Sequence, residues 1–151
     1  MDGYHLPLRF LDEEGKRRRG AAYTFDASSF RADLEHLKQT GAGVFPGWSH
    51  TRQDPEPGQI RIGPETTRVF VEGLYVLMDS WQTHPLFDLK IFVACDLHTA
   101  LRRVETRLLE CGIVTDGREA ARHRVETNDR LNAEAILADG CRERADFVVQ
   151  T

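Results

Sequence analysis

The sequence is poor in cysteine and contains no long apolar run. Its three cysteines, Cys95, Cys111 and Cys141, are odd in number and widely spaced, and no CxxC pair or zinc-ligand pattern occurs. This usage predicts reduced thiols in a cytoplasmic protein rather than a disulfide framework. No apolar stretch reaches the roughly 18 residues that a membrane-spanning helix needs, and the N-terminus lacks a signal-peptide pattern. We therefore expect no membrane association.

Lysine is also scarce, since only three of the 20 basic residues are lysines. The arginine excess favours an anionic ligand, because guanidinium groups bind phosphates and carboxylates bidentately, although genomic base composition would give the same bias. The net charge of −4 argues against sequence-independent binding to nucleic acid. A length of 151 residues predicts one domain with a sizeable core.

The apolar run Val69-Phe70-Val71 predicts a strand that is covered on both faces and ends at Glu72-Gly73. Ligands of open α/β sheets bind outside the carboxyl ends of the strands. A carboxylate at this position can orient a metal-bound water or a reacting hydroxyl, and the glycine allows a sharp turn. The alternative interpretation is a strand end with a solvated glutamate.

Three other polar clusters are candidates for function. Asp2, Tyr4 and His5 place a carboxylate, a phenol and an imidazole within four positions, or they form a disordered polar tail. The basic run 16–19 is interpreted as a solvated loop, with a nucleic-acid patch and a phosphate-facing loop as alternatives. Residues 42–66 predict a long irregular connection with a short strand at 59–62, and residues 48–52 within it suit either a polar substrate or a packed surface loop.

The remaining pattern alternates strands with helices. A helix capped by Asp26 or Ser28 ends at Gly41, and helices follow at about 97–111, after Asp116, and up to about 138. Further strands are predicted at 89–95 and 145–149, and residues 8–24 are predicted as a loop. Three buried strands among helices predict an α/β fold with a mainly parallel sheet.

Five motifs occur in a fixed order: MDGYHLP, RRRGAAYTFD, an SH…DP loop, VFVEGLYVLMD and ETNDRLN. With these motifs the chain resembles the phosphoribulokinase/uridine kinase family of P-loop kinases, which includes type I pantothenate kinase. The resemblance covers nearly the whole chain. It implies a single P-loop kinase-like domain over residues 1–151, with a lid region at about 102–130. It also implies ATP and Mg²⁺ as cofactors and a small-molecule acceptor, while a homo-oligomer stays open.

The resemblance also implies roles for individual residues. Asp2 is expected to act as general base or to orient the acceptor hydroxyl, and Glu72 to lie near the magnesium ion as an indirect ligand. The residues expected in the substrate pocket are Tyr4, His5, His50 and Arg52. Two lid arginines, Arg103 and Arg107, are expected to bind the nucleotide phosphates, and Arg107 is expected to be catalytic. An NDxxN element without an assigned role comprises Asn128, Asp129 and Asn132.

The chain departs from this family pattern in one major respect. P-loop kinases place a GxxxxGK[ST] turn before the strand that leads to Asp2, whereas the only Gly-Lys pair here is Gly15-Lys16, followed by Arg17. Leu74, Leu108 and Gly47-Trp48 also replace residues typical of the family. The expected fold is therefore incomplete at its N-terminus, and we expect an N-terminally truncated form of a longer kinase.

Three functional hypotheses follow. The first is an ATP-dependent kinase acting on a nucleoside, sugar or vitamin-like hydroxyl. The second is a non-catalytic pseudo-kinase or fragment with a binding role, which the missing P-loop favours. The third is an arginine-rich nucleic-acid binder, which the net negative charge disfavours.

Overall fold

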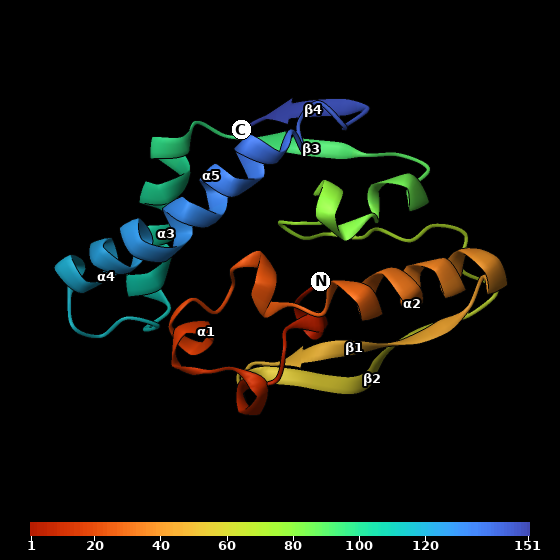
Figure 1. Ribbon diagram of the computed structural model, residues 1–151, viewed down its shortest axis with the longest axis horizontal. Coiled ribbons are helices and arrows are strands. Elements are labelled where there is room, and N and C mark those ends of the chain that lie inside the picture. Colours follow the sequence, from red (N-terminus) through yellow and green to blue (C-terminus); the bar gives the residue numbers. More distant parts are fainter. The chain divides into compact units, whose positions relative to one another are not determined.

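The computed structural model describes residues 1–151 and divides into two compact units, Met1–Asp88 and Leu89–Thr151 (Figure 1). Each unit combines helices with one two-stranded sheet, so the chain is of the α/β class. The prediction of a single domain over the whole chain stays a prediction. None of the helices is long and apolar enough to cross a membrane.

The first unit is built from two helices and an antiparallel hairpin: α1 (Glu13–Arg17), α2 (Ala27–Thr40), β1 (Gly43–Ser49) and β2 (Asp54–Ile62). Single turns of 3-10 helix lie at Asp2–Tyr4, Leu8–Phe10, Ala22–Thr24, Asp79–Trp81 and His84–Leu86. Residues 8–24 are therefore largely helical turns and not the predicted loop, because Asp12 caps α1 by accepting the Gly15 N–H at 2.7 Å. In Figure 1, α2 runs along the hairpin and packs against β1.

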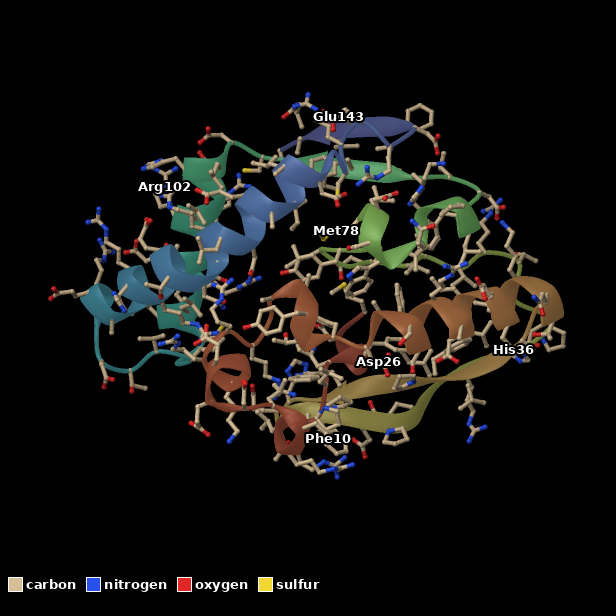
Figure 2. The ribbon with its side chains drawn as sticks, viewed as in Figure 1. Phe10, Asp26, His36, Met78, Arg102 and Glu143 are labelled. Atoms are coloured by element: carbon tan, nitrogen blue, oxygen red, sulfur yellow. The ribbon has the colours of Figure 1, made fainter.

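The ends of α2 confirm the predicted helix signals. The Asp26 carboxylate accepts a 2.9 Å hydrogen bond from the Ser29 N–H at the first turn, and Figure 2 labels Asp26 beside the start of α2. Gly41 adopts a left-handed conformation with φ of 70°, which ends the helix. Phe30 is buried on the inner face, as the apolar stripe predicts.

The hairpin corrects the prediction of a long irregular connection over residues 42–66. β1 pairs with β2 from Gly43 opposite Ile62 to Ser49 opposite Asp54, with a register shift between Phe45 and Gly47. The predicted short strand at 59–62 is the last part of β2. Each strand of a two-stranded sheet has a free edge, and proline is tolerated at edges and bulges, so the proline content did not exclude strands here.

The predicted strand at Val69–Val71 is wrong for this structure. The segment forms no strand, and the Phe70 side chain is 92% exposed. The side chains suit a buried strand, but a strand also needs a neighbour to pair with its N–H and C=O groups, and no strand pairs with this segment.

The core of the first unit is aromatic. Phe25, Phe30, Tyr75 and Trp81 are buried, and the Tyr75 and Trp81 ring centroids lie 5.7 Å apart. The fully buried Tyr75 donates a 2.6 Å hydrogen bond from its hydroxyl to the Gly20 carbonyl oxygen. This bond satisfies the phenol inside the core and ties the segment after Glu72 to the segment before α2.

The second unit joins three helices to a parallel strand pair: β3 (Ile91–Ala94), α3 (Leu97–Glu110), α4 (Arg118–Arg124), α5 (Arg130–Asp139) and β4 (Phe147–Gln150) (Figure 1). The predicted helices and strands are present. The Asp96 carboxylate caps α3 by accepting the Thr99 N–H at 2.9 Å. The helix core comprises Leu101, Leu108, Ala121 and Val125.

The β3 and β4 strands are less buried than predicted, since Val93 is 63% exposed and every residue of β4 is exposed. The chain contains one antiparallel and one parallel strand pair. The mainly parallel sheet therefore stays a prediction.

Candidate functional site

The two predicted carboxylates come from segments that meet in the first unit. The main-chain nitrogen of Met1 donates a 2.9 Å hydrogen bond to the Glu72 carbonyl oxygen, across 71 positions of sequence. A Cβ built on Gly73 would collide with the Met1 side chain, so glycine permits this approach. Asp2 and Glu72 are both exposed. The structure thus brings together the backbone segments that carry these carboxylates, although the predicted strand is absent.

The turn that carries Asp2 rests directly on the hairpin. A Cβ on Gly3 would overlap the Pro46 carbonyl group and lie 3.0 Å from the Gly47 nitrogen. Backbone therefore packs on backbone at this point, and β1 fixes the position of the Asp2–Tyr4 turn.

Tyr4 is buried and hydrogen-bonded inside the unit. Its hydroxyl donates to the Asp33 carboxylate on α2 at 2.7 Å, and its ring meets Phe30 edge-on with centroids 4.9 Å apart. Burial, followed by the hydrogen bond to the Asp33 charge, raises the pKa of Tyr4 above its ordinary value. The phenol therefore stays protonated and anchors the turn to α2. A role for Tyr4 in a substrate pocket stays a prediction.

His5 lies against two aromatic rings. Its centroid is 3.9 Å from that of Phe25 and 4.7 Å from that of Trp48. Its Nδ1 lies 2.9 Å from the Asp2 carbonyl oxygen, which can only accept, so Nδ1–H is the donor. Burial lowers the pKa of His5, and the nearby Arg19 charge acts in the same direction, although the Asp2 contacts oppose it. The neutral ring then presents Nε2 as a hydrogen-bond acceptor.

Sequence reasoning missed Arg19, which is the last residue of the basic run 16–19. Its guanidinium donates to the Leu6 carbonyl at 3.1 Å, to the Gln53 carbonyl and to the Asp54 carboxylate at 2.7 Å. It also lies 5.0 Å from the Trp48 ring centroid. No local signal marks Arg19, because its partners lie up to 35 positions away.

Lys16 and Arg17 are solvated, as the sequence predicts, and each pairs at i,i+3 with a glutamate on the surface, but both lie in helix α1 and not in a loop. Asp54, the ionic partner of Arg19, is only partly exposed and also accepts the Leu8 N–H at 3.0 Å. Burial acts to raise the pKa of Asp54, but the Leu8 and Arg19 hydrogen bonds outweigh it and the pKa is lowered.

His50 and Arg52 lie in the exposed turn between β1 and β2. The Arg52 guanidinium pairs with Glu56 at 2.8 Å, and the His50 carbonyl accepts from the Gln53 side chain at 3.0 Å. Neither residue is hydrogen-bonded to Tyr4 or His5. The structure does not bring these four predicted substrate residues into one bonded cluster.

In the second unit, Arg103 and Arg107 lie one helical turn apart on α3, and both side chains are exposed. An Arg103 Nη1 lies 3.5 Å from the Cys95 sulfur, whereas the Arg107 guanidinium forms no ion pair. An arginine pair at this spacing can bind a phosphate through charge-assisted hydrogen bonds.

Asn128 and Asp129 of the NDxxN element end a π-helical turn, Val125–Asp129, which joins α4 to α5, and Asn132 lies in α5. The sequence predicts a break at residues 128–132, but the backbone stays helical from α4 through this turn into α5, so that prediction is wrong. Asn128 and Asn132 are buried, with 4% and 8% exposure, whereas Asp129 is half-buried. π-helical turns occur frequently at functional sites, but the residues here stay without an assigned role.

No group of three or more His, Cys, Asp or Glu side chains is arranged to hold a metal ion. This finding is compatible with magnesium, which proteins commonly bind through one or two carboxylates together with substrate phosphates. The exposed Glu72 carboxylate supplies an oxygen ligand of the required type.

No family model matches the chain. Individual relatives do match: the ATP-dependent kinase-like protein notR' of Aspergillus versicolor is 36% identical over 150 residues, which cover 91% of this chain and 87% of that protein. The ATP-dependent kinase YFH7 of Saccharomyces cerevisiae is 30% identical over 90% of this chain, but this chain spans only 50% of YFH7.

Solved structures give the same result. A proposed fructose transport system kinase from Silicibacter sp. TM1040 aligns with a TM-score of 0.86 and 30% identity over 98% of this chain and 71% of that chain. The YFH7 structure, described as a proposed P-loop-containing kinase with a circular permutation, aligns with a TM-score of 0.79 and 27% identity over 100% of this chain and 56% of that chain. The chain therefore belongs to the P-loop kinase family, among the ATP-dependent kinase-like proteins.

Proposed function

We propose that this protein transfers a phosphoryl group from ATP to the hydroxyl of a small metabolite. The observation that carries the proposal is the junction of the Met1–Asp2 and Glu72–Gly73 segments, which is fixed by the 2.9 Å hydrogen bond from Met1 to the Glu72 carbonyl. Phosphoryl transfer to a hydroxyl needs a carboxylate for the leaving proton and acidic ligands near the phosphates. Two exposed carboxylates at one junction supply these groups.

Each residue then has a separate role in the proposal. Asp2 accepts the proton of the acceptor hydroxyl or orients that hydroxyl, and Glu72 would hold magnesium indirectly. Bound magnesium would neutralise the charge on the phosphate oxygens. Arg103 and Arg107 in the second unit bind nucleotide phosphates, because their exposed guanidinium groups lie one turn apart on α3. Residues 1–151 contain no GxxxxGK[ST] sequence, so we assign no residue of this chain to a phosphate-binding loop.

The His5 ring restricts which chemical group of the acceptor can bind beside Asp2. The Nδ1–H group is bonded to the Asp2 carbonyl, so the neutral ring has only an acceptor nitrogen to offer. A hydroxyl donates to such a nitrogen, whereas a phosphate or carboxylate does not. A nucleoside, sugar or vitamin-like polyol fits this requirement, and a sugar is in line with the proposed fructose-related role of the Silicibacter protein.

The decisive experiment is an ADP-formation assay on the full chain with ATP and Mg²⁺, using fructose, ribose, uridine and pantothenate as acceptors. We expect acceptor-dependent ADP release with at least one of them, and we expect ATP to raise the melting temperature. Asp2→Asn should lower turnover by about 10²–10⁴-fold, the range for loss of general-base catalysis, and leave the ATP-induced stabilisation unchanged. Near-full turnover in this variant would show that Asp2 is not the base.

The second candidate function is a non-catalytic binding role, because the chain has no P-loop sequence. The kinase names of the relatives do not favour this alternative. A chain that shows neither ATP-induced stabilisation nor ADP formation would reverse that preference.

A further inference from the structure

Arg19 is much less exposed than Lys16 and Arg17 of the same run. Its side chain is only 14% exposed, whereas that of Arg17, two positions earlier, is 75% exposed. Its guanidinium donates to oxygen atoms of Leu6, which follows His5, of Gln53, which precedes β2, and of Asp54, the first residue of β2. One side chain therefore joins the segment that carries His5 to the hairpin.

The guanidinium also takes part in a chain of contacts between aromatic rings, whose planes are tilted to one another. It lies 5.0 Å from the Trp48 ring centroid, Trp48 lies 4.7 Å from His5, and His5 lies 3.9 Å from Phe25. Phe25 belongs to the buried aromatic core, so this end of the chain of rings is fixed. Trp48 is only half-buried and lies near the end of β1, where it contacts both Arg19 and His5.

We propose that Arg19 is a positioning residue: it holds Trp48 against the His5 ring, so that His5 keeps Nδ1–H on the Asp2 carbonyl and Nε2 available to a ligand. The inference rests on the proposed function, since it concerns the acceptor side of that site. It requires an arginine, because a planar guanidinium stacks on a ring while its N–H groups bond oxygens in the same plane. Lysine cannot combine these two contacts.

The charges around His5 allow this role to be separated from a simple electrostatic effect. The charged groups that act on the ring are Asp2, Arg19 and the Met1 amino group, while Phe25 and Trp48 shield it from water. Loss of Arg19 removes a positive charge and also loosens Trp48, and both changes raise the pKa of His5. The loss of charge acts on His5 directly, whereas the looser packing acts only by way of the Trp48 side chain.

The test follows His5 by ¹H–¹⁵N NMR of the imidazole nitrogens in the full chain, with the His5 signals assigned by their loss in His5→Gln. We expect the wild type to show the Nδ1–H tautomer and a pKa below the ordinary histidine value. Arg19→Met should raise that pKa and give a mixed tautomer pattern, and Arg19→Lys should not restore the wild-type pattern. The matched control Arg17→Met removes an exposed arginine of the same run and should leave His5 unchanged.

A double-mutant cycle with Trp48→Leu tests whether Arg19 affects the His5 pKa through Trp48 or through its charge alone. If Arg19 acts through Trp48, the double variant should exceed Trp48→Leu only by the direct effect of the lost charge, so its shift of the His5 pKa should be smaller than the sum of the two single shifts. Additive shifts, or restoration by Arg19→Lys, would overturn the inference, because either result assigns the effect to charge. Wild-type behaviour of Arg19→Met would overturn it as well.

A milder variant covers the case in which Arg19→Met does not fold. Asp54→Asn removes the ionic partner of Arg19 but leaves its bonds to the Leu6 and Gln53 carbonyls. It keeps the Arg19 charge, so the tautomer pattern of His5 is the readout: the pattern should shift toward that of Arg19→Met by a smaller amount, and a wild-type tautomer pattern would overturn the inference. These readouts need no catalytic activity, so a failed kinase assay and a failed positioning test are distinguishable.

Discussion

The Tyr4 hydroxyl donates a 2.7 Å hydrogen bond to the Asp33 carboxylate, and this bond ties the turn that carries Asp2 to α2. The donor is buried and the acceptor is charged, a combination that makes a hydrogen bond stronger than a neutral pair. Because Tyr4 is separated from Asp2 by one glycine, the bond also limits how far Asp2 can move. Stability and geometry of the candidate site are therefore coupled at this position.

Tyr4→Phe should lower the free energy of unfolding by about 1–2 kcal/mol, because a buried hydrogen bond to a charged group is lost while the ring remains. Urea denaturation at neutral pH measures the change. Tyr23→Phe is the control, since Tyr23 is 58% exposed and should change stability by less than about 0.5 kcal/mol. Equal effects of the two substitutions would show that the Asp33 bond contributes nothing net.

His5 predicts a loss of stability on mild acidification. Its pKa in the folded chain is lowered, so below about pH 6.5 the unfolded chain binds a proton that the folded chain resists. The stabilising contribution is complete above that pH and is lost as the pH falls toward the folded-state pKa. Urea unfolding at several pH values between about 7.5 and 5 should therefore show a smaller decline for His5→Gln than for the wild type. His36→Gln removes an exposed histidine and should follow the wild-type curve, and parallel curves for all three proteins would contradict the prediction.

Local signals in the sequence predicted the helices well. Asp26 and Asp96 are recognisable caps, and Gly41 ends α2 through a left-handed conformation that needs no distant partner. The strands depended on pairing, which the sequence does not display. Val69–Val71 has strand-like side chains without a paired neighbour, whereas the proline-containing segments 43–49 and 54–62 pair with each other.

In the candidate site, too, the sequence predicted what local motifs mark and missed what depends on distant contacts. Motif order pointed to Asp2 and Glu72, and the segments that carry them do meet. The sequence indicates that Arg19 is one solvated arginine among several, because its contacts are with Trp48 and Asp54, two residues that are far from it in the sequence. Side chains that act through long-range contacts leave no periodic pattern for sequence reasoning to detect.

Gly3→Ala should destabilise the first unit by about 1–3 kcal/mol, the usual cost of overpacking. The added methyl group would meet the Pro46 carbonyl and the Gly47 nitrogen, and these backbone atoms cannot rotate away. Thermal or urea unfolding measures the loss. Gly63→Ala is the matched control, because its methyl group would meet only the flexible Glu65 carboxylate. A Gly3→Ala variant as stable as this control would show that the turn does not rest on β1.

Arg107→Ala tests the proposed role of α3 in phosphate binding. The Arg107 side chain is exposed and forms no ion pair, so its removal should change the free energy of unfolding by less than about 0.5 kcal/mol. If Arg107 stabilises charge on the transferred phosphoryl group, turnover should fall by about 10²–10³-fold, as for loss of other preorganised donors. The KM for the acceptor should stay unchanged, because the guanidinium acts on the phosphate.

The control for this prediction is Arg102→Ala, which removes another exposed arginine of α3, labelled in Figure 2. Arg102 is adjacent to Arg103 in sequence but does not share the i,i+4 spacing of Arg103 and Arg107, so its loss should reduce turnover only slightly. Steady-state kinetics of both variants with a saturating acceptor and varied ATP separates the two cases. If both lose turnover equally, α3 contributes only general positive charge. If neither variant loses turnover, Arg107 does not contact the phosphates, and the test of Asp2 no longer depends on Arg107.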